Sequence, residues 1–156
     1  MMEVERILGI DLGRQFGWAV LDSQGRHLAG GSIRLEKEHM GQRLVELANH
    51  IHRIGMAYKV DAVVVEEPPY VQNAATHRDL SAYWGVVLVE AEDRLLPYTD
   101  VAVGTLKKFA TGDGRASKKD MRHAFEEHFG SVPDDDNHAD AAFCALYGAA
   151  EVWPNV

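Results

Sequence analysis

The alternation of hydrophobic and polar residues predicts that the chain begins with three short strands. Apolar runs occupy residues 5–11, 16–22 and 27–35, and residues with high turn propensity separate each run from the next. Strands that follow one another so closely pair side by side in opposite directions. The first part of the chain is therefore expected to form an antiparallel meander.

The hydrophobic pattern in the middle of the chain predicts two further strands, each preceded by a helix. Hydrophobic residues recur at helical spacing over about 40–58 and again over about 75–96. Residues 61–69, DAVVVEEPP, are a β-branched apolar run that two prolines end, which is typical of a buried parallel strand. Residues 98–103 have the composition of another short strand.

The last third of the chain is expected to be helical. The predicted helices are a short one at 105–110, one from the Ser117–Asp120 capping box to about Phe129, and a last one to about Glu151. Asp136 or Asn137 is expected to cap the last helix, because Asp and Asn are favoured at helix N-caps. A glycine-rich loop, TGDGRA, follows the short helix.

The composition fits one globular domain and excludes several classes of protein. At 156 residues, with 46% hydrophobic and 26% charged residues, the chain can bury a core, and we take residues 1–156 as one domain. The single cysteine, Cys144, excludes a disulfide framework and a cysteine-based zinc site. No leader sequence and no membrane-length apolar run is visible, so we expect a soluble cytoplasmic protein with no membrane partner.

The overall net charge of −8 is unevenly distributed along the chain. Residues 104–123 carry a net charge of +4, which leaves −12 for the remainder. The basic residues of this segment are Lys107, Lys108, Arg115, Lys118, Lys119 and Arg122. A basic stripe in an otherwise acidic chain suits a protein that holds a polyanion next to a metal ion, because carboxylates alone would repel the substrate.

Acidic residues at the ends of predicted elements are the strongest sign of chemistry. Asp11 and Glu66 each end an apolar strand, and open α/β sheets bind ligands at the carboxyl ends of their strands. In the stretch PDDDNHADAAF, residues 133–143, Asp136 and Asp140 are four apart and can share one helical face. Four converging carboxylates repel one another unless divalent cations lie between them, and oxygen ligands favour Mg²⁺ or Mn²⁺.

Four segments resemble, in order, the blocks of RuvC-type Holliday-junction resolvases, which belong to the RNase H-like superfamily. They are ILGIDLGRQFGWAVLD, VVVEEPPYVQNA, VAVGTLKKFATGDGRASKKDM and DDDNHADAAFCALYG. The resemblance covers roughly residues 5–150 and extends to phage-type members. It implies an RNase H-like α/β fold with a five-stranded mixed sheet, three strands antiparallel and then two parallel, flanked by helices. It also implies a homodimeric endonuclease that cuts four-way DNA junctions with two Mg²⁺ ions per active site, for which Mn²⁺ substitutes.

By position, the resemblance places the first three metal ligands of the family on Asp11, Glu66 and Asp140. Glu67 is the rival to Glu66, but successive strand side chains point to opposite sides, and the family uses the acid directly after the apolar run.

The fourth ligand is where the sequence departs from bacterial members, which usually place Asp or His at the position of Asn137. Asp136 matches the spacing of mitochondrial and many phage-like members and is our choice. His138 is the alternative, as a ligand or a proton shuttle. Asp134 and Asp135 are expected to be a solvated helix cap.

The resemblance also assigns roles to residues outside the acidic set. Lys107 and Lys118 align with lysines that contact DNA and support catalysis near the scissile phosphate. Lys108, Arg115, Lys119 and Arg122 are expected to position the DNA backbone without reading its sequence. Tyr70 is the candidate for an aromatic wedge at the junction crossover, and Asn73 of the same PPYVQNA stretch is expected to contact DNA.

Three other functions compete with a resolvase. GIDLG at residues 9–13 also resembles the phosphate-binding hairpin of actin-like and sugar-kinase ATPases, but their second hairpin and adenosine-binding segment are missing. A different RNase H-like nuclease, acting on RNA–DNA hybrids or on pre-ribosomal RNA, would keep the same site. A non-catalytic module that binds DNA junctions would not need the acidic residues.

Overall fold

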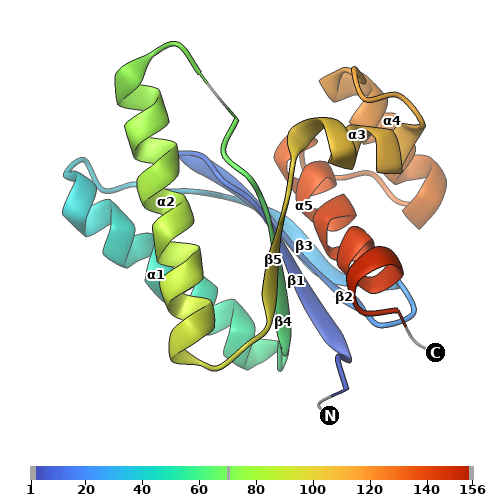
Figure 1. Ribbon diagram of the computed structural model, residues 1–156, viewed down its shortest axis with the longest axis horizontal. Helices are drawn as coiled ribbons and strands as arrows, with labels where there is room; N and C mark the ends of the chain where they lie inside the picture. Colours follow the sequence, from blue (N-terminus) through green and yellow to red (C-terminus); the bar gives the residue numbers. More distant parts are fainter. Residues whose placement is uncertain (1–2, 70, 155–156) are drawn as a thin grey trace.

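A computed structural model of the chain describes residues 3–69 and 71–154, and it contains one sheet with helices on both faces (Figure 1). The strands are β1 (Arg6–Asp11), β2 (Gln15–Asp22), β3 (His27–Arg34), β4 (Ala62–Glu66) and β5 (Tyr98–Val101). The helices are α1 (Met40–Ala57), α2 (Ala74–Asp93), α3 (Val103–Thr111), α4 (Lys118–Phe129), α5 (Asp136–Tyr147) and the π-helical η1 (Gly148–Val152). Every predicted strand and helix is present, with ends that differ by a few residues.

The sheet has the strand order β3-β2-β1-β4-β5 and mixes two kinds of pairing. β1 pairs antiparallel with β2, and β2 with β3, because short turns join them. β4 lies parallel to β1, and β5 parallel to β4, because helices α1 and α2 carry the chain back between these strands. The prediction of a five-stranded mixed sheet with three antiparallel and two parallel strands is confirmed.

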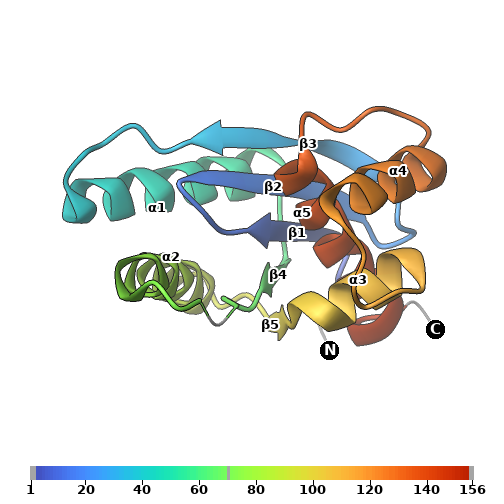
Figure 2. The ribbon, with the colours of Figure 1, turned by 90° about the horizontal axis from the view of Figure 1, so that it is seen from above.

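The helices form two layers with the sheet between them. Helices α1 and α2 cover one face of the sheet, and α3, α4 and α5 lie on the other (Figures 1 and 2). Along β1 the side chains alternate, so that Ile7 packs in the core below α5 and Leu8 in the core below α1 and α2. By the same alternation Asp11 lies on the α5 side, and on β4 Val64 and Glu66 lie on that side too.

Helix α5 packs unusually close to β1 and β2, because glycines stand beneath it. A Cβ atom added at Gly9 would overlap the carbonyl oxygen of Ala141, and one added at Gly17 would overlap the carbonyl of Asn137. Glycine therefore permits a backbone-to-backbone approach that no other residue allows at these positions. The approach brings the start of α5 down to the end of the sheet where β1 and β4 terminate.

The start of the last helix differs from the prediction. The N-cap of α5 is Asp135, whose carboxylate accepts a hydrogen bond from the backbone N–H of His138, so neither Asp136 nor Asn137 is the cap. After Tyr147 the helix continues as a π-helical turn to Val152, close to the predicted end at Glu151. Within residues 3–69 and 71–154, no helix has the length and hydropathy needed to cross a membrane.

Candidate metal centre

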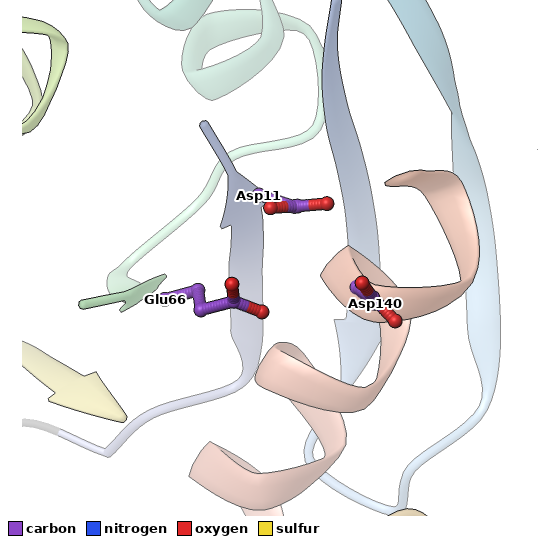
Figure 3. Close-up of side chains that lie close together, drawn as sticks. All are labelled: Asp11, Glu66 and Asp140. Atoms are coloured by element: carbon purple, nitrogen blue, oxygen red, sulfur yellow. The ribbon is translucent and has the colours of Figure 1, made fainter. Parts of the chain in front are cut away.

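Three carboxylates from distant parts of the chain come together at the end of the sheet. Asp11 ends β1, Glu66 ends the neighbouring β4, and Asp140 lies one turn into α5. One carboxylate oxygen from each lies within 4.8 Å of the others, and Figure 3 shows the three side chains extending into one common space. In the described part of the chain this is the only such group of three or more potential ligands.

Burial and mutual repulsion raise the pKa of all three carboxyl groups. Asp11 is only 8% exposed, and its burial, followed by the charges of Glu66 and Asp140, raises its pKa well above the usual range. Burial and the charge of Asp140 raise the pKa of Glu66 to about 7. Burial and the charge of Asp136 raise the pKa of Asp140 to about 7. The cluster is therefore an electrostatically unfavourable arrangement when it has no counter-charge.

The donor set of the cluster fits a divalent cation. The Oδ1 atom of Asp140 is buried and has no hydrogen-bond partner, the one such side-chain atom among the described residues. A buried acceptor without a partner is costly, and within the described chain none of the three carboxylates forms an ion pair with a lysine or arginine. A hard cation with oxygen ligands would satisfy the orphan oxygen and neutralise the repulsion.

Comparison with known proteins connects this site to a family. The family model described as "Crossover junction endodeoxyribonuclease RuvC" matches residues 7–146. The chain belongs to the RuvC family. A relative of the same description from Ruegeria pomeroyi is 32% identical over 155 residues, covering 94% of each chain.

Solved structures share the fold of this RuvC-family chain. One is the Thermus thermophilus RuvC in complex with a Holliday junction substrate, with a TM-score of 0.83, 24% identity and coverage of 93% of each chain. The Fowlpox virus resolvase in complex with Holliday junction DNA has a TM-score of 0.63 at 14% identity, covering 96% of this chain and 99% of that one. At these identities the likeness concerns the fold.

Asp136 lies beside the cluster without joining it. Its carboxylate faces α4, where it pairs with Lys118 at 3.8 Å and Arg122 at 3.9 Å. Its negative charge still contributes to the raised pKa values of Asp11 and Asp140, so it is near enough to influence both. The sequence reading of this RuvC-family chain places four carboxylates in the site; the structure brings three together and keeps the fourth at the rim.

His138 faces away from the carboxylates. Its Nδ1 accepts a hydrogen bond from the backbone N–H of Asp134 at 3.0 Å, and its Nε2 lies 3.0 Å from Nε2 of His27 on β3. The side chain is 5% exposed and packs against Phe125. Its direction agrees with a helical offset of two residues from Asp140, which turns it to the other side of α5. The structure therefore does not bring His138 to the site.

Glu67 is separated from the cluster by strand alternation. Its side chain is exposed, and its backbone N–H donates to the carbonyl of Val101 and extends the pairing of β4 with β5. Glu66, one residue earlier, points to the α5 side. The choice of Glu66 over Glu67 thus agrees with the geometry, while metal binding by Glu66 stays a prediction.

The basic residues of α3, α4 and the loop between them differ in exposure and in their effect on the cluster. Lys107 is half-buried, and its positive charge lowers the pKa of Glu66 and Asp140, against the larger effects of burial and carboxylate repulsion. The charge of Lys118 acts on Asp140 in the same direction. Lys108, Arg115 and Lys119 are exposed and therefore open to a polyanion.

Asn73 and Tyr70, in the segment after Glu66, were both predicted to approach the DNA junction. Asn73 is the N-cap of α2, and its side-chain oxygen accepts a hydrogen bond from the N–H of Thr76 at 3.0 Å. This structural role was not predicted, and contact between Asn73 and DNA stays a prediction. Tyr70, the candidate wedge, lies outside the described residues.

Asp135 has more partners than a solvated cap. Its Oδ1 accepts from Ser32 on β3 at 2.5 Å and from the His138 backbone at 2.9 Å, and its Oδ2 accepts from Gln15 at 2.9 Å. Burial alone raises its pKa, but these hydrogen bonds outweigh burial and lower the pKa below the usual range. The expectation that Asp135 caps the helix is confirmed, but the expectation that it is merely solvated was wrong. No local pattern indicated these bonds, because Ser32 and Gln15 lie more than a hundred residues away.

Proposed function

We propose that this RuvC-family chain is a metal-dependent endonuclease that resolves four-way DNA junctions by paired symmetric nicks. The observation that carries the proposal is the buried cluster of Asp11, Glu66 and Asp140, with its orphan oxygen, beside a basic stripe on α3 and α4. The Ruegeria pomeroyi relative is named a crossover junction endodeoxyribonuclease, and the Thermus thermophilus structure holds a Holliday junction substrate.

In this proposal Asp11, Glu66 and Asp140 hold Mg²⁺, for which Mn²⁺ substitutes, and Asp136 is the fourth carboxylate. Two such ions would supply activation of a water molecule and stabilisation of the leaving oxygen in phosphodiester hydrolysis. The chain's own contribution is to hold the acids in place on two strands and one helix, which are more rigid supports than loops.

The basic residues have two roles in the proposal. Lys107 and Lys118, whose charges reach the carboxylates, hold the scissile phosphate against a site that would otherwise repel it. Four further residues contact the phosphate backbone and position the junction without reading sequence. They are Lys108, Arg115, Lys119 and Arg122, and Asn73 and Tyr70 are proposed to approach the crossover.

The proposal includes a homodimer, because paired symmetric nicks require two sites related by a twofold axis. Helix α2 offers a surface for self-association on its outer side. The position of a Cβ at Gly85 is open, and Val89, one turn later, is 65% exposed. A small residue next to an exposed hydrophobic one allows two copies of the helix to approach closely.

The proposal further takes residues 1–156 as a single nuclease domain that acts in the cytoplasm. In this compartment the junctions formed during recombination of chromosomal or phage DNA are accessible to it. The sheet, both helical layers and all three clustered acids belong to the same packed unit, since strands β1 and β4 contribute to the cores on both faces.

The proposal is tested by incubating the protein with an immobile four-way junction, a duplex and an RNA–DNA hybrid, each with Mg²⁺, Mn²⁺ or EDTA. We expect paired symmetric nicks on the junction alone, abolished by EDTA and by Asp140→Asn. Cleavage of the hybrid in preference to the junction would be consistent with the proposed site and would contradict the proposed substrate. Junction binding without cleavage under either metal would contradict the proposal that the protein is an enzyme.

A further inference from the structure

The carboxylate of Asp135 links helix α5 to two strands of the sheet, β2 and β3. It accepts hydrogen bonds from Gln15 at the start of β2, from Ser32 on β3 and from the His138 N–H in the first turn of α5. Neither oxygen is left to solvent alone, and the Ser32 bond, at 2.5 Å, has the length of a strong charge-assisted bond. This set of three bonds is the Asp135 anchor.

The anchor adds charge-assisted hydrogen bonds to an interface that has few polar contacts. Elsewhere on α5, His138 Nε2 lies 3.0 Å from His27 Nε2 on β3, and Cys144 Sγ donates to the carbonyl of Ile10 on β1 at 3.9 Å. The rest of the contact with β1 and β2 is glycine backbone against helix backbone, at Gly9 and Gly17, and the buried alanines Ala139, Ala141 and Ala142. Such flat contacts permit close approach but have few projections to stop the helix from turning or sliding. Directed hydrogen bonds to Asp135 define where the helix begins and how it is rotated.

The rotation of α5 decides which side chains face the site. Asp140 points to Asp11 and Glu66, whereas His138 points to His27. Asp135 is five residues before Asp140, or about 7.5 Å along a helix axis, so it does not contact Asp140. Its charge contributes to the raised pKa values of Asp140 and Asp11, and its hydrogen bonds act on Asp140 through the helix. Metal ligands tolerate displacements of only about 0.5 Å, so a small turn of α5 would disperse the cluster.

We propose that Asp135 is a positioning residue, which through Gln15 and Ser32 holds α5 in the rotation that brings Asp140 into the metal site. The inference rests on the proposed metal-dependent function and adds a residue to it. Removal of the anchor is expected to weaken metal binding, because the partners that orient metal ligands commonly contribute about tenfold or more to metal affinity.

The test measures Mn²⁺ affinity by the EPR signal of the free ion, at pH 8, for the full chain and its variants. We expect Asp135→Ala to weaken Mn²⁺ binding about tenfold. Asp135→Asn, which keeps a good N-cap and an acceptor for Ser32, is expected to restore affinity to within about threefold of wild type. Asp22→Ala is the matched control, because it removes a carboxylate that accepts hydrogen bonds from the backbone N–H groups of Gln24 and Arg26, at the end of the sheet opposite to the cluster.

The outcomes separate a positioning role from simple helix capping. Asp22→Ala, which also removes a hydrogen-bonded carboxylate, is expected to lower thermal stability and to leave Mn²⁺ affinity unchanged. Wild-type affinity in Asp135→Ala, with the same loss of stability, would reduce Asp135 to a helix cap and overturn the inference. If Asp135→Ala does not fold, Ser32→Ala, which deletes one bond of the anchor, replaces it in the test. Weaker Mn²⁺ binding by Ser32→Ala supports the inference, and unchanged binding overturns it.

The same titration distinguishes failure of the inference from failure of the proposed function. Wild-type protein that binds no Mn²⁺ would contradict the metal-dependent nuclease, and Asp135 would then have no metal site to position. Wild-type binding that Asp140→Asn abolishes and Asp135→Ala leaves intact would contradict only the inference.

Discussion

At the scale of single residues, Asp140 has the features of a functional group that destabilises the metal-free fold. It is a buried carboxylate with an oxygen that has no partner, and two further acids of the site repel it. Asp140→Asn removes one negative charge while keeping the shape of the side chain. We expect the variant to abolish cleavage and to raise the melting temperature of metal-free protein by about 2–4 °C, equivalent to about 1 kcal/mol.

Differential scanning calorimetry in EDTA, paired with the junction assay, checks this prediction. Asp113→Asn, which changes an exposed aspartate in the loop after α3, controls for the loss of a charge as such. A lower melting temperature for Asp140→Asn than for wild type would show that the carboxylate is stabilising, in conflict with the direction of its pKa shift.

The raised pKa values of Glu66 and Asp140 predict a pH dependence with opposite signs for stability and for metal binding. Both rise to about 7 in the folded chain from ordinary values of 4.5 and 3.8. Between about pH 4 and pH 7 the folded state therefore holds more protons than the unfolded state. The contribution of these two groups to the stability of metal-free protein is expected to fall as pH rises through this window, and Mn²⁺ affinity to rise.

Urea denaturation in EDTA at several pH values, with Mn²⁺ titrations at the same values, tests this dependence. The contribution is read from the difference in unfolding free energy between wild type and Glu66→Gln, because His27, His50 and His138, with pKa values lowered by burial, stabilise the fold as pH rises. The difference should level off well above pH 7, where both carboxyl groups are ionised. A difference that shifts in favour of wild type from pH 5 to pH 7 would contradict the raised pKa values.

At the scale of elements, the close packing of α5 on the sheet depends on glycine at positions 9 and 17. Gly17→Ala places a Cβ against the Asn137 backbone, which cannot move without shifting α5. We expect a destabilisation of about 1–3 kcal/mol, as for other overpacked sites, with weaker Mn²⁺ binding. Gly41→Ala in α1, where the added methyl meets no atom within 4 Å, is the control and should stabilise by up to about 1 kcal/mol.

Equilibrium unfolding in urea gives both free energies. Equal effects of Gly17→Ala and Gly41→Ala would mean that α5 adjusts without cost and that its height above the sheet is not fixed by the glycine.

Helix α3 places two adjacent lysines in different positions, which predicts two different kinetic effects. Lys107 is half-buried beside the carboxylates, whereas Lys108 is exposed. We expect Lys107→Ala to lower kcat by about a hundredfold. Lys108→Ala is expected mainly to weaken junction binding and to reduce the slope of log affinity against log salt by about one.

Single-turnover cleavage and binding titrations in EDTA over a range of salt separate the two effects. The assignment of Lys107 to the reaction would be wrong if both variants lost only affinity.

At the scale of the whole molecule, the proposed homodimer predicts that the outer side of α2 controls assembly. Val89→Glu places a charge on this surface, whereas Val45→Glu does the same on the outer side of α1, where the side chain is 60% exposed. We expect Val89→Glu to shift the protein to monomers in sedimentation velocity and to convert paired nicks into single ones. Val45→Glu should stay dimeric; a dimeric Val89→Glu would place the interface elsewhere.

Much of the fold and part of the site followed from the sequence, because local patterns determine them. Hydrophobic patterns located the strands and helices α1 and α2, a capping box located α4, and the turns between the first strands determined which strands pair antiparallel. Strand alternation placed Glu66 and Glu67 on opposite sides of the sheet, and the family resemblance selected Glu66, which lies on the side of α5. The helical offset between His138 and Asp140 made His138 the less favoured choice for the fourth ligand, and the structure turns it away from the site.

Only the tertiary structure decided how the rim of the site is arranged. Asp136 turns to Lys118 and Arg122 on α4, and Asp135 is bound by Ser32 on β3, because the height and rotation of α5 over the sheet bring these distant residues together. The height of α5 above the sheet follows from glycines in β1 and β2. Local periodicity does not reveal this effect, because the helix lies more than a hundred residues further along the chain. The sequence thus determined which acids the chain has and which elements carry them, while the packing of one helix determined which three converge.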